Sequence, residues 1–197
     1  KEASEMPGFF EKQLENCGVE YFDYYLLHAL DEGAAKQAEE WGAFDFMLEK
    51  KAKGLVKHVG FSFHDKAEVL DKILTRHPEM EYVQLQLNYA DWEDSEVQSR
   101  KCYEVAQKYG VPVIVMEPVK GGTLANMTGR PAEILKELSP EASFASYAIR
   151  YAASLENVML VLSGMSDEQQ LIDNTAYMRE FRPLDERERA AIARVVE

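Results

Sequence analysis

Polar residues stand at the ends of several short apolar runs, where they could take part in chemistry. His28 ends the run FDYYLLH, and Ser62 lies near the exit of LVKHVGFSF. A neutral imidazole such as that of His28 can donate a hydrogen bond to a substrate oxygen or shuttle a proton. Taken alone, His28 is explained more simply as a histidine that is hydrogen-bonded within a loop, so its role stays open.

Two glutamines alternate with leucines in the run YVQLQLNY. Gln84 and Gln86 are two residues apart, so in a strand both side chains point to the same side. Polar side chains on the inner face of a sheet need hydrogen-bonding partners. The amide of a cofactor would be one such partner, and interior water would be another.

The segment SGMSDEQQLIDN leaves an apolar run through Gly164 and enters a helical segment. Ser166 and Gln169 have the spacing of a capping box, which predicts Ser166 as the N-cap. The N-terminus of a helix also presents unpaired N–H groups and the positive end of its dipole, which suit a phosphate. A cap alone and a cap with a phosphate site are both consistent with the sequence.

A second candidate for anion binding is the loop from Lys120 to Gly129, which is longer than most connections. Its start, KGGT, has two glycines that let the backbone approach a ligand and a lysine that could meet an anion. A flexible surface loop is an equally good interpretation.

The elements that must position these residues are short apolar runs separated by single amphipathic helical segments, the pattern of a parallel sheet with crossover helices. Because no GxGxxG motif occurs, a barrel is favoured over a doubly wound sheet. A complete barrel needs eight strand-helix units in roughly 250 residues. The sequence therefore predicts an α/β fold, a TIM (β/α)8 barrel present as a partial barrel of about five units without its N-terminal strands, with residues 1–197 as one domain. The predicted strands are Phe22–His28, Leu55–Phe63, Tyr82–Tyr89, Val111–Pro118 and Val158–Gly164, and the predicted helices end near Cys17 or span Phe44–Lys53, Asp65–Leu74, Ser95–Tyr109, Glu141–Ala153 and Asp167–Met178.

Composition narrows the classes of function. The formal net charge of -13, without clustered Lys or Arg, argues against a nucleic-acid partner. Cys17 and Cys102 have no metal-ligand spacing, so we expect a reduced cytoplasmic setting and no metal site. The chain has no secretory signal and no apolar stretch near the roughly 20 residues that span a bilayer, so no membrane partner is expected.

Five motifs in this order resemble the second part of an aldo-keto reductase, over the stretch from Phe9 to about Met178. They are FDYYLLH, GLVKHVGFSFH, VQLQLNY, VMEPVKGGTL and VLSGMSDEQQLIDN. The resemblance is to bacterial members in which a ferredoxin-like iron-sulfur module follows the barrel. No cysteine cluster occurs before Glu197, so that module would be absent or lie outside this sequence.

The resemblance implies a barrel that binds NADPH, or NADH, across its C-terminal mouth and transfers hydride to an aldehyde or ketone. His28 would be the catalytic residue that orients and polarises the carbonyl. Gln170 stands where arginine is common, which leaves the choice between NADPH and NADH open. A carboxylate at Glu117 would repel the pyrophosphate unless it turned away or paired with Lys120. The cofactor-binding residues that the resemblance implies are Ser62, Gln84, Met116, Glu117, Val119, Gly121, Gly164, Met165, Ser166, Gln170, Asp173 and Asn174.

The family's catalytic Tyr, Lys and Asp belong to strands that would precede Lys1. We therefore expect the parent protein to be a reductase and this chain alone to be nearly inactive, because general acid catalysis contributes roughly 10²- to 10⁴-fold. Two alternatives remain. One is a nucleotide-binding or regulatory module without catalysis, and the other is a structural fragment that self-associates through open barrel edges, since unpaired strands invite association.

Overall fold

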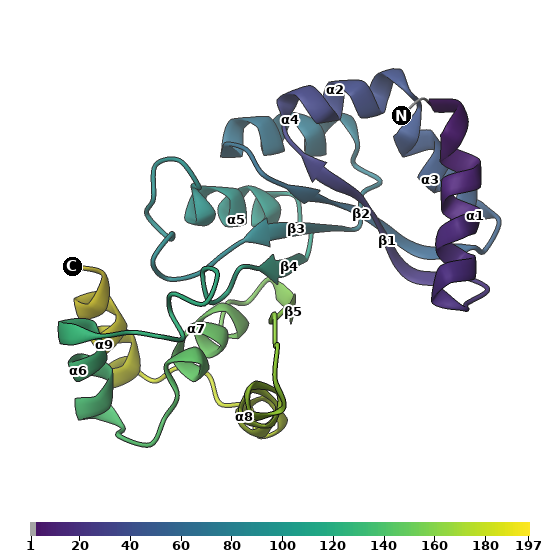
Figure 1. The fold of residues 1–197 in the computed structure, drawn as a ribbon. Coiled ribbons are helices and arrows are strands. Elements are labelled where there is room, and N and C mark those ends of the chain that lie inside the picture. Colours follow the sequence, from purple (N-terminus) through teal and green to yellow (C-terminus); the bar gives the residue numbers. More distant parts are fainter. Residues whose placement is uncertain (1–2) are drawn as a thin grey trace. The chain divides into compact units, whose positions relative to one another are not determined.

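The computed structural model describes residues 3–197 and has an α/β fold with a five-strand parallel sheet in the order β1-β2-β3-β4-β5 (Figure 1). The chain divides into two compact units. The first holds residues up to Gln84 together with Lys101–Pro112, and the second holds Leu85–Arg100 with Val113–Glu197. The predicted alternation of strands and helices is confirmed.

The first unit contains most of the N-terminal elements. Its first helix ends at Gly18, whose left-handed φ of 65° lets the backbone leave the helix, as the sequence predicted. The elements are η1 (Ala3–Glu5), α1 (Met6–Cys17), β1 (Phe22–Leu30), α2 (Glu32–Glu40), α3 (Ala43–Ala52), β2 (Val56–Phe63), α4 (Ala67–Arg76), the start of β3 (Tyr82–Gln86) and most of α5 (Ser99–Lys108).

Strands β1 and β2 pair in parallel from Phe22 opposite Val56 to Leu27 opposite Phe61. The register then shifts before Leu30 meets Phe63, and Ala29 at that point has a positive φ of 56°. The helix α1 packs on this pair through Phe10, which is buried and meets the ring of Tyr25 edge-on. Aromatic packing therefore holds α1 on the same strand that carries His28.

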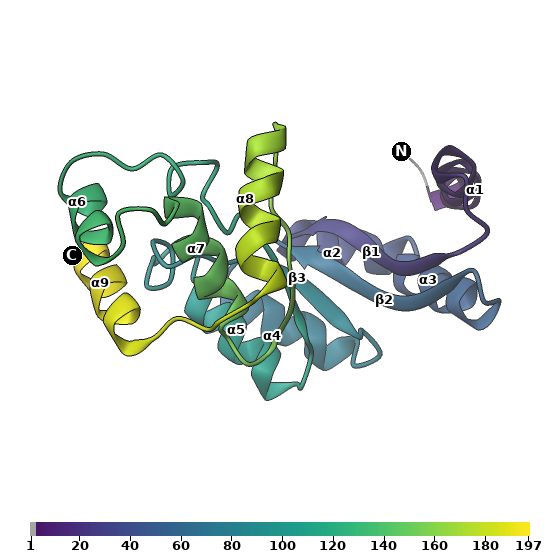
Figure 2. The same ribbon diagram turned by 90° about the horizontal axis from the view of Figure 1, so that it is seen from below.

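The second unit is built on a parallel pair of short strands, with Val113 opposite Val158. Helices α6 and α9 lie side by side in both views (Figures 1 and 2) and share a buried core with α7. Its elements are β4 (Val113–Met116), α6 (Gly129–Leu138), α7 (Phe144–Ala153), β5 (Val158–Val161), α8 (Glu168–Arg179) and α9 (Glu186–Val196). The buried core residues of this cluster are Tyr89, Leu124, Ile134, Leu135, Tyr147, Ala148, Leu184, Ala191 and Ile192.

Three helices were absent from the sequence prediction: α2, α6 and α9. Two of them start from carboxylate N-caps, Asp31 for α2 and Asp185 for α9. At the start of α9, Asp185 and Glu188 form a full capping box. The Glu188 carboxylate also accepts two hydrogen bonds from Arg150, of 2.7 and 2.9 Å. Local carboxylate caps therefore mark the starts of two of the helices that the sequence prediction missed.

Strand β5 exposes apolar side chains, with Met159 and Leu160 44% and 47% accessible. Tyr24 on β1 is 47% accessible as well. In residues 3–197, no helix is both long and apolar enough to cross a membrane.

A close approach between strands requires glycine at position 60. A methyl group there would meet the carbonyl oxygen of Tyr82 and lie 2.8 Å from its buried ring. We predict that Gly60→Ala lowers the free energy of unfolding by about 1–3 kcal/mol, because the backbone must shift to admit the group. Urea denaturation measures this loss. The matched control is Gly8→Ala in α1, where nothing lies within 4 Å, and an equal loss in both variants would contradict the steric account.

The two cysteines differ in reactivity. Cys17 is exposed, whereas burial, together with the charge of Asp65, raises the pKa of the Cys102 thiol to about 12. Because the thiolate is the reactive form, we predict that a disulfide reagent at pH 8 titrates one thiol quickly in the native chain and the second only after unfolding. Two fast thiols in the native chain would show that Cys102 is not enclosed.

Candidate functional site

A cavity of about 640 Å³ in the second unit is bordered by the loop after β4 and by the turn between β5 and α8. These are the two segments that the sequence singled out for anion binding. The cavity brings together nine of the predicted cofactor-binding residues: Glu117, Val119, Gly121, Gly164, Met165, Ser166, Gln170, Asp173 and Asn174.

The loop after β4 is a series of tight turns. Glu117, Lys120, Gly121 and Gly122 all have positive φ, from 49° to 90°. The two glycines adopt this conformation without steric cost, whereas Glu117 and Lys120 must be held in it by other contacts. The loop is therefore specified by its surroundings as well as by its glycines.

A buried polar network supplies one of those contacts. The amide nitrogen of Asn88, which is fully buried, donates to the Asp91 carboxylate at 2.8 Å and to the carbonyl of Glu117 at 3.1 Å. The oxygen of the same amide accepts from the backbone nitrogen of Asp91 at 2.9 Å. Asn88 thus ties the residue that begins the loop to the end of the β3 segment.

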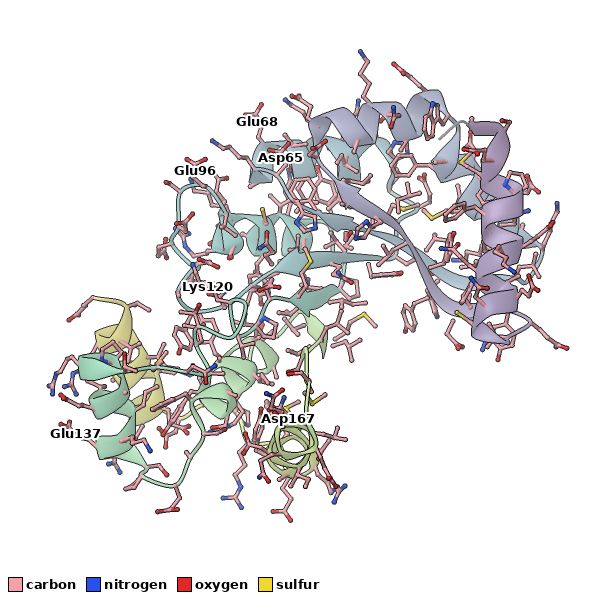
Figure 3. All side chains as sticks on the ribbon, viewed as in Figure 1. Asp65, Glu68, Glu96, Lys120, Glu137 and Asp167 are labelled. Atoms are coloured by element: carbon pink, nitrogen blue, oxygen red, sulfur yellow. The ribbon has the colours of Figure 1, made fainter. Side chains whose placement is uncertain are left out.

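The same network fixes Lys120, one of the residues labelled in Figure 3. Its ammonium group is paired with the other oxygen of Asp91, a carboxylate that is only 4% accessible. An ionised carboxylate buried to this degree needs both a counter-ion and hydrogen bonds, and Lys120 and Asn88 provide them. Asp91 was not among the predicted site residues, although an Asn and an Asp three residues apart after a strand are typical of a side-chain-stabilised turn.

Glu117 turns back onto its own loop. Its carboxylate accepts a hydrogen bond of 2.7 Å from the backbone nitrogen of Gly121. The predicted alternative, a pair between Glu117 and Lys120, is wrong because Lys120 is bound to Asp91. One backbone N–H of the glycine turn is therefore already held by an anionic group of the chain itself.

The first turn of α8 forms the opposite border of the cavity. Asp167, which Figure 3 labels beside α8, caps the N-terminus of this helix by accepting from the Gln170 backbone nitrogen at 2.8 Å. The Gln170 side chain in turn accepts from the Ser166 backbone nitrogen at 2.8 Å. The prediction that Ser166 is the N-cap was wrong by one residue, because the Asp167 side chain accepts from the Gln170 backbone nitrogen.

Asn174 of α8 lies on the same side of the cavity. It is buried and donates to the Ser163 hydroxyl at 2.8 Å. Its oxygen accepts from the Tyr177 hydroxyl at 2.6 Å. Burial, followed by the nearby charge of Asp173, raises the pKa of Tyr177, so this phenol keeps its proton and remains a donor. Asn174 therefore fixes the turn after β5 to α8.

The other predicted site residues lie on strands and do not border this cavity. His28 is exposed on β1 and borders a small apolar cavity of about 240 Å³ in the first unit, together with Tyr25 and Trp41. Ser62 is buried, and its hydroxyl accepts from the backbone nitrogen of Ala29 at 2.7 Å. This bond satisfies the irregular backbone that follows His28 and leaves the Ser62 hydroxyl proton for another acceptor.

Gln84 and Met116 are half-buried, in β3 and at the end of β4. Gln84 belongs to the first unit and Met116 to the second. Gln84 is the central residue of β3, whereas Met116 is the last residue of β4.

With this geometry in view, comparison with known families is informative. The Aldo/keto reductase family matches residues 2–197, so the chain belongs to that family. Comparison with curated protein sequences gave no match.

Solved structures show the same fold at low sequence identity. The holo form of an aldo-keto reductase from Bacillus halodurans is 20% identical with a TM-score of 0.76, and the match covers 100% of this chain and 66% of that one. An aldo-keto reductase from Klebsiella pneumoniae in complex with NADPH is 18% identical with a TM-score of 0.71, and the match covers 95% and 63%. This chain thus spans about two thirds of the length of the structures that it matches.

The buried network gives a stability prediction. Lys120→Met removes the counter-ion of Asp91, and we expect the free energy of unfolding to fall by about 1–3 kcal/mol, because a buried carboxylate loses its charge partner. The control is Lys36→Met, which removes an exposed pair with Glu40 at 4.0 Å and should change stability by less than about 0.5 kcal/mol. Equal urea midpoints for the two variants would contradict the role given to Asp91.

Proposed function

We propose that this chain forms the cofactor-holding part of an aldo-keto reductase barrel that reduces an aldehyde or ketone with NAD(P)H. The supporting observation is the cavity of the second unit, which gathers nine residues predicted from separate motifs. Two of the matched Klebsiella pneumoniae structures were solved with NADPH or NADP, which supports the same cofactor class here.

The residues around the cavity fit a dinucleotide. Gly121 and Gly122 have positive φ and no side chain, so a phosphate can approach their backbone closely. Ser166 and Asn174 offer neutral polar groups, and Asp173 offers an acceptor for sugar hydroxyls. We assign the phosphates to the space beside Gly121 and Gly122, which have no side chains, and to the start of α8, where the positive end of the helix dipole lies.

The cofactor would supply hydride to the carbonyl carbon. The chain's own part in that step falls to His28, which would donate a hydrogen bond to the carbonyl oxygen and orient it. Ser62 and Gln84 would hold the carboxamide end. Ser62 is suited to this because the bond from Ala29 fixes its hydroxyl and leaves it able to donate.

The proton donor of the family reaction, a tyrosine assisted by lysine and aspartate, has no counterpart among the motifs that carry the resemblance. We therefore propose that the 197-residue chain binds nucleotide but reduces carbonyls very slowly by itself. An assay of NADPH or NADH oxidation with simple aldehydes tests this proposal. Turnover at ordinary enzyme rates would contradict it, whereas nucleotide binding without turnover would also suit a regulatory module.

Binding at the glycine turn is testable by adding bulk to it. We predict that Gly121→Val weakens nucleotide binding at least about tenfold, because a branched side chain would occupy the phosphate position. A tenfold rise in the dissociation constant corresponds to a loss of about 1.4 kcal/mol of binding free energy. Titration with fluorescence or calorimetric detection measures the dissociation constant. The matched control is Gly110→Val, which has a similar positive φ of 66° and open space around it in the first unit. Equal weakening in both variants would point to general destabilisation instead of a site at Gly121.

Two finer proposals follow from the resemblance and the fold. An iron-sulfur module in a longer parent chain would be found by iron analysis of that protein, and an iron-free parent would exclude it. Self-association through β5 is favoured by its exposed Met159 and Leu160. A monomer at high concentration in light scattering would count against such association.

A further inference from the structure

The cavity has an unusual distribution of charge for a site that receives a phosphorylated ligand. Two carboxylates border it, Glu117 and Asp173, and its remaining borders are glycine, apolar or neutral polar residues. Within residues 3–197, no lysine or arginine lines the cavity. Lys120 belongs to the same loop, but its ammonium group is bound to buried Asp91.

The first turn of α8 adds further negative charge. Asp167 caps the helix and Glu168 follows it. Carboxylates in this position compensate the positive end of the helix dipole and stabilise the helix. They also reduce the attraction that this helix start would otherwise have for a strongly charged phosphate.

Gln170 is held as a neutral group in this turn. Its side-chain oxygen accepts from the Ser166 backbone nitrogen at 2.8 Å and lies 3.3 Å from the Ser166 hydroxyl oxygen. An amide can donate a hydrogen bond to a ligand but brings no charge. An arginine in its place would bring a planar cation suited to phosphate.

We propose, on the basis of the proposed nucleotide-binding function, that this cavity selects a nicotinamide dinucleotide that lacks a 2'-phosphate, NADH over NADPH. The specificity-determining residues are Asp173 and Gln170. A phosphomonoester carries nearly two negative charges at neutral pH, and its recognition calls for arginine or lysine. A carboxylate instead accepts hydrogen bonds from the ribose hydroxyls of the unphosphorylated nucleotide.

The two dinucleotides differ by one phosphate group. Both nucleotides share the pyrophosphate, so the repulsion from Glu117 affects them alike and the backbone of the glycine turn serves them alike. The extra phosphate distinguishes them, and it meets no cationic side chain of the described residues anywhere along the cavity. Discrimination therefore falls to the residues proposed to face that phosphate, Asp173 and Gln170.

The test is a parallel titration of the 197-residue chain with NADH and NADPH at fixed ionic strength. We expect NADH to bind at least about tenfold more tightly, which corresponds to one missing charge-assisted contact. In Gln170→Arg, the ratio of the NADPH to the NADH dissociation constant should fall at least about tenfold relative to the parent chain, because the added cation meets the 2'-phosphate that only NADPH carries. The matched control is Gln37→Arg, an exposed position on α2 in the first unit, which should leave both dissociation constants unchanged.

The outcomes separate the two proposals. Equal affinities, or tighter binding of NADPH, would overturn the preference and leave the nucleotide-binding function in place. Failure of both nucleotides to bind would overturn the proposed function and, with it, the preference. A gain in NADPH affinity of the same size in Gln170→Arg and Gln37→Arg would show a general effect of net charge and would contradict the assignment to Gln170.

Discussion

The buried carboxylate of Asp91 is the constraint on which the candidate site depends. A charge at 4% accessibility is costly unless it is neutralised and hydrogen-bonded, and here one lysine and one asparagine meet both needs. Because Asn88 also holds the carbonyl of Glu117, the network fixes both ends of the first turn of the loop. Two non-glycine residues with positive φ, Glu117 and Lys120, are then kept in place without help from a ligand.

Two further contacts hold the remaining borders of the cavity in place. The loop is tied near its middle by Leu124, which lies in the core formed with α6, α7 and α9. The opposite border is tied by Asn174, which joins the turn after β5 to α8. A preorganised site needs less ordering when a ligand binds, so the polar contacts that define this cavity also favour affinity.

The positions of the strands and of the glycine turns could be predicted from the sequence, whereas the partners of the polar side chains could not. Strand ends and glycine positions are local features, and they located β1 to β5, the Gly18 cap and the two segments that border the cavity. The direction of a side chain depends on its partners. The pairing of Lys120 with Asp91, which lies 29 residues away, and the return of Glu117 onto Gly121 required the folded chain. The N-cap of α8 was displaced by one residue because Ser166 and Asp167 are both good caps, and spacing alone could not choose between them.

The central claim is that the loop after β4 and the turn before α8 form one nucleotide site. Hydrogen–deuterium exchange of the chain with and without NADH tests it most directly, since bound ligand slows exchange where backbone is covered or ordered. The account predicts slower exchange in residues 117–126 and 163–174, with α9 (Glu186–Val196) unchanged as an internal reference. Protection confined to other segments, or no protection at saturating NADH, would contradict it.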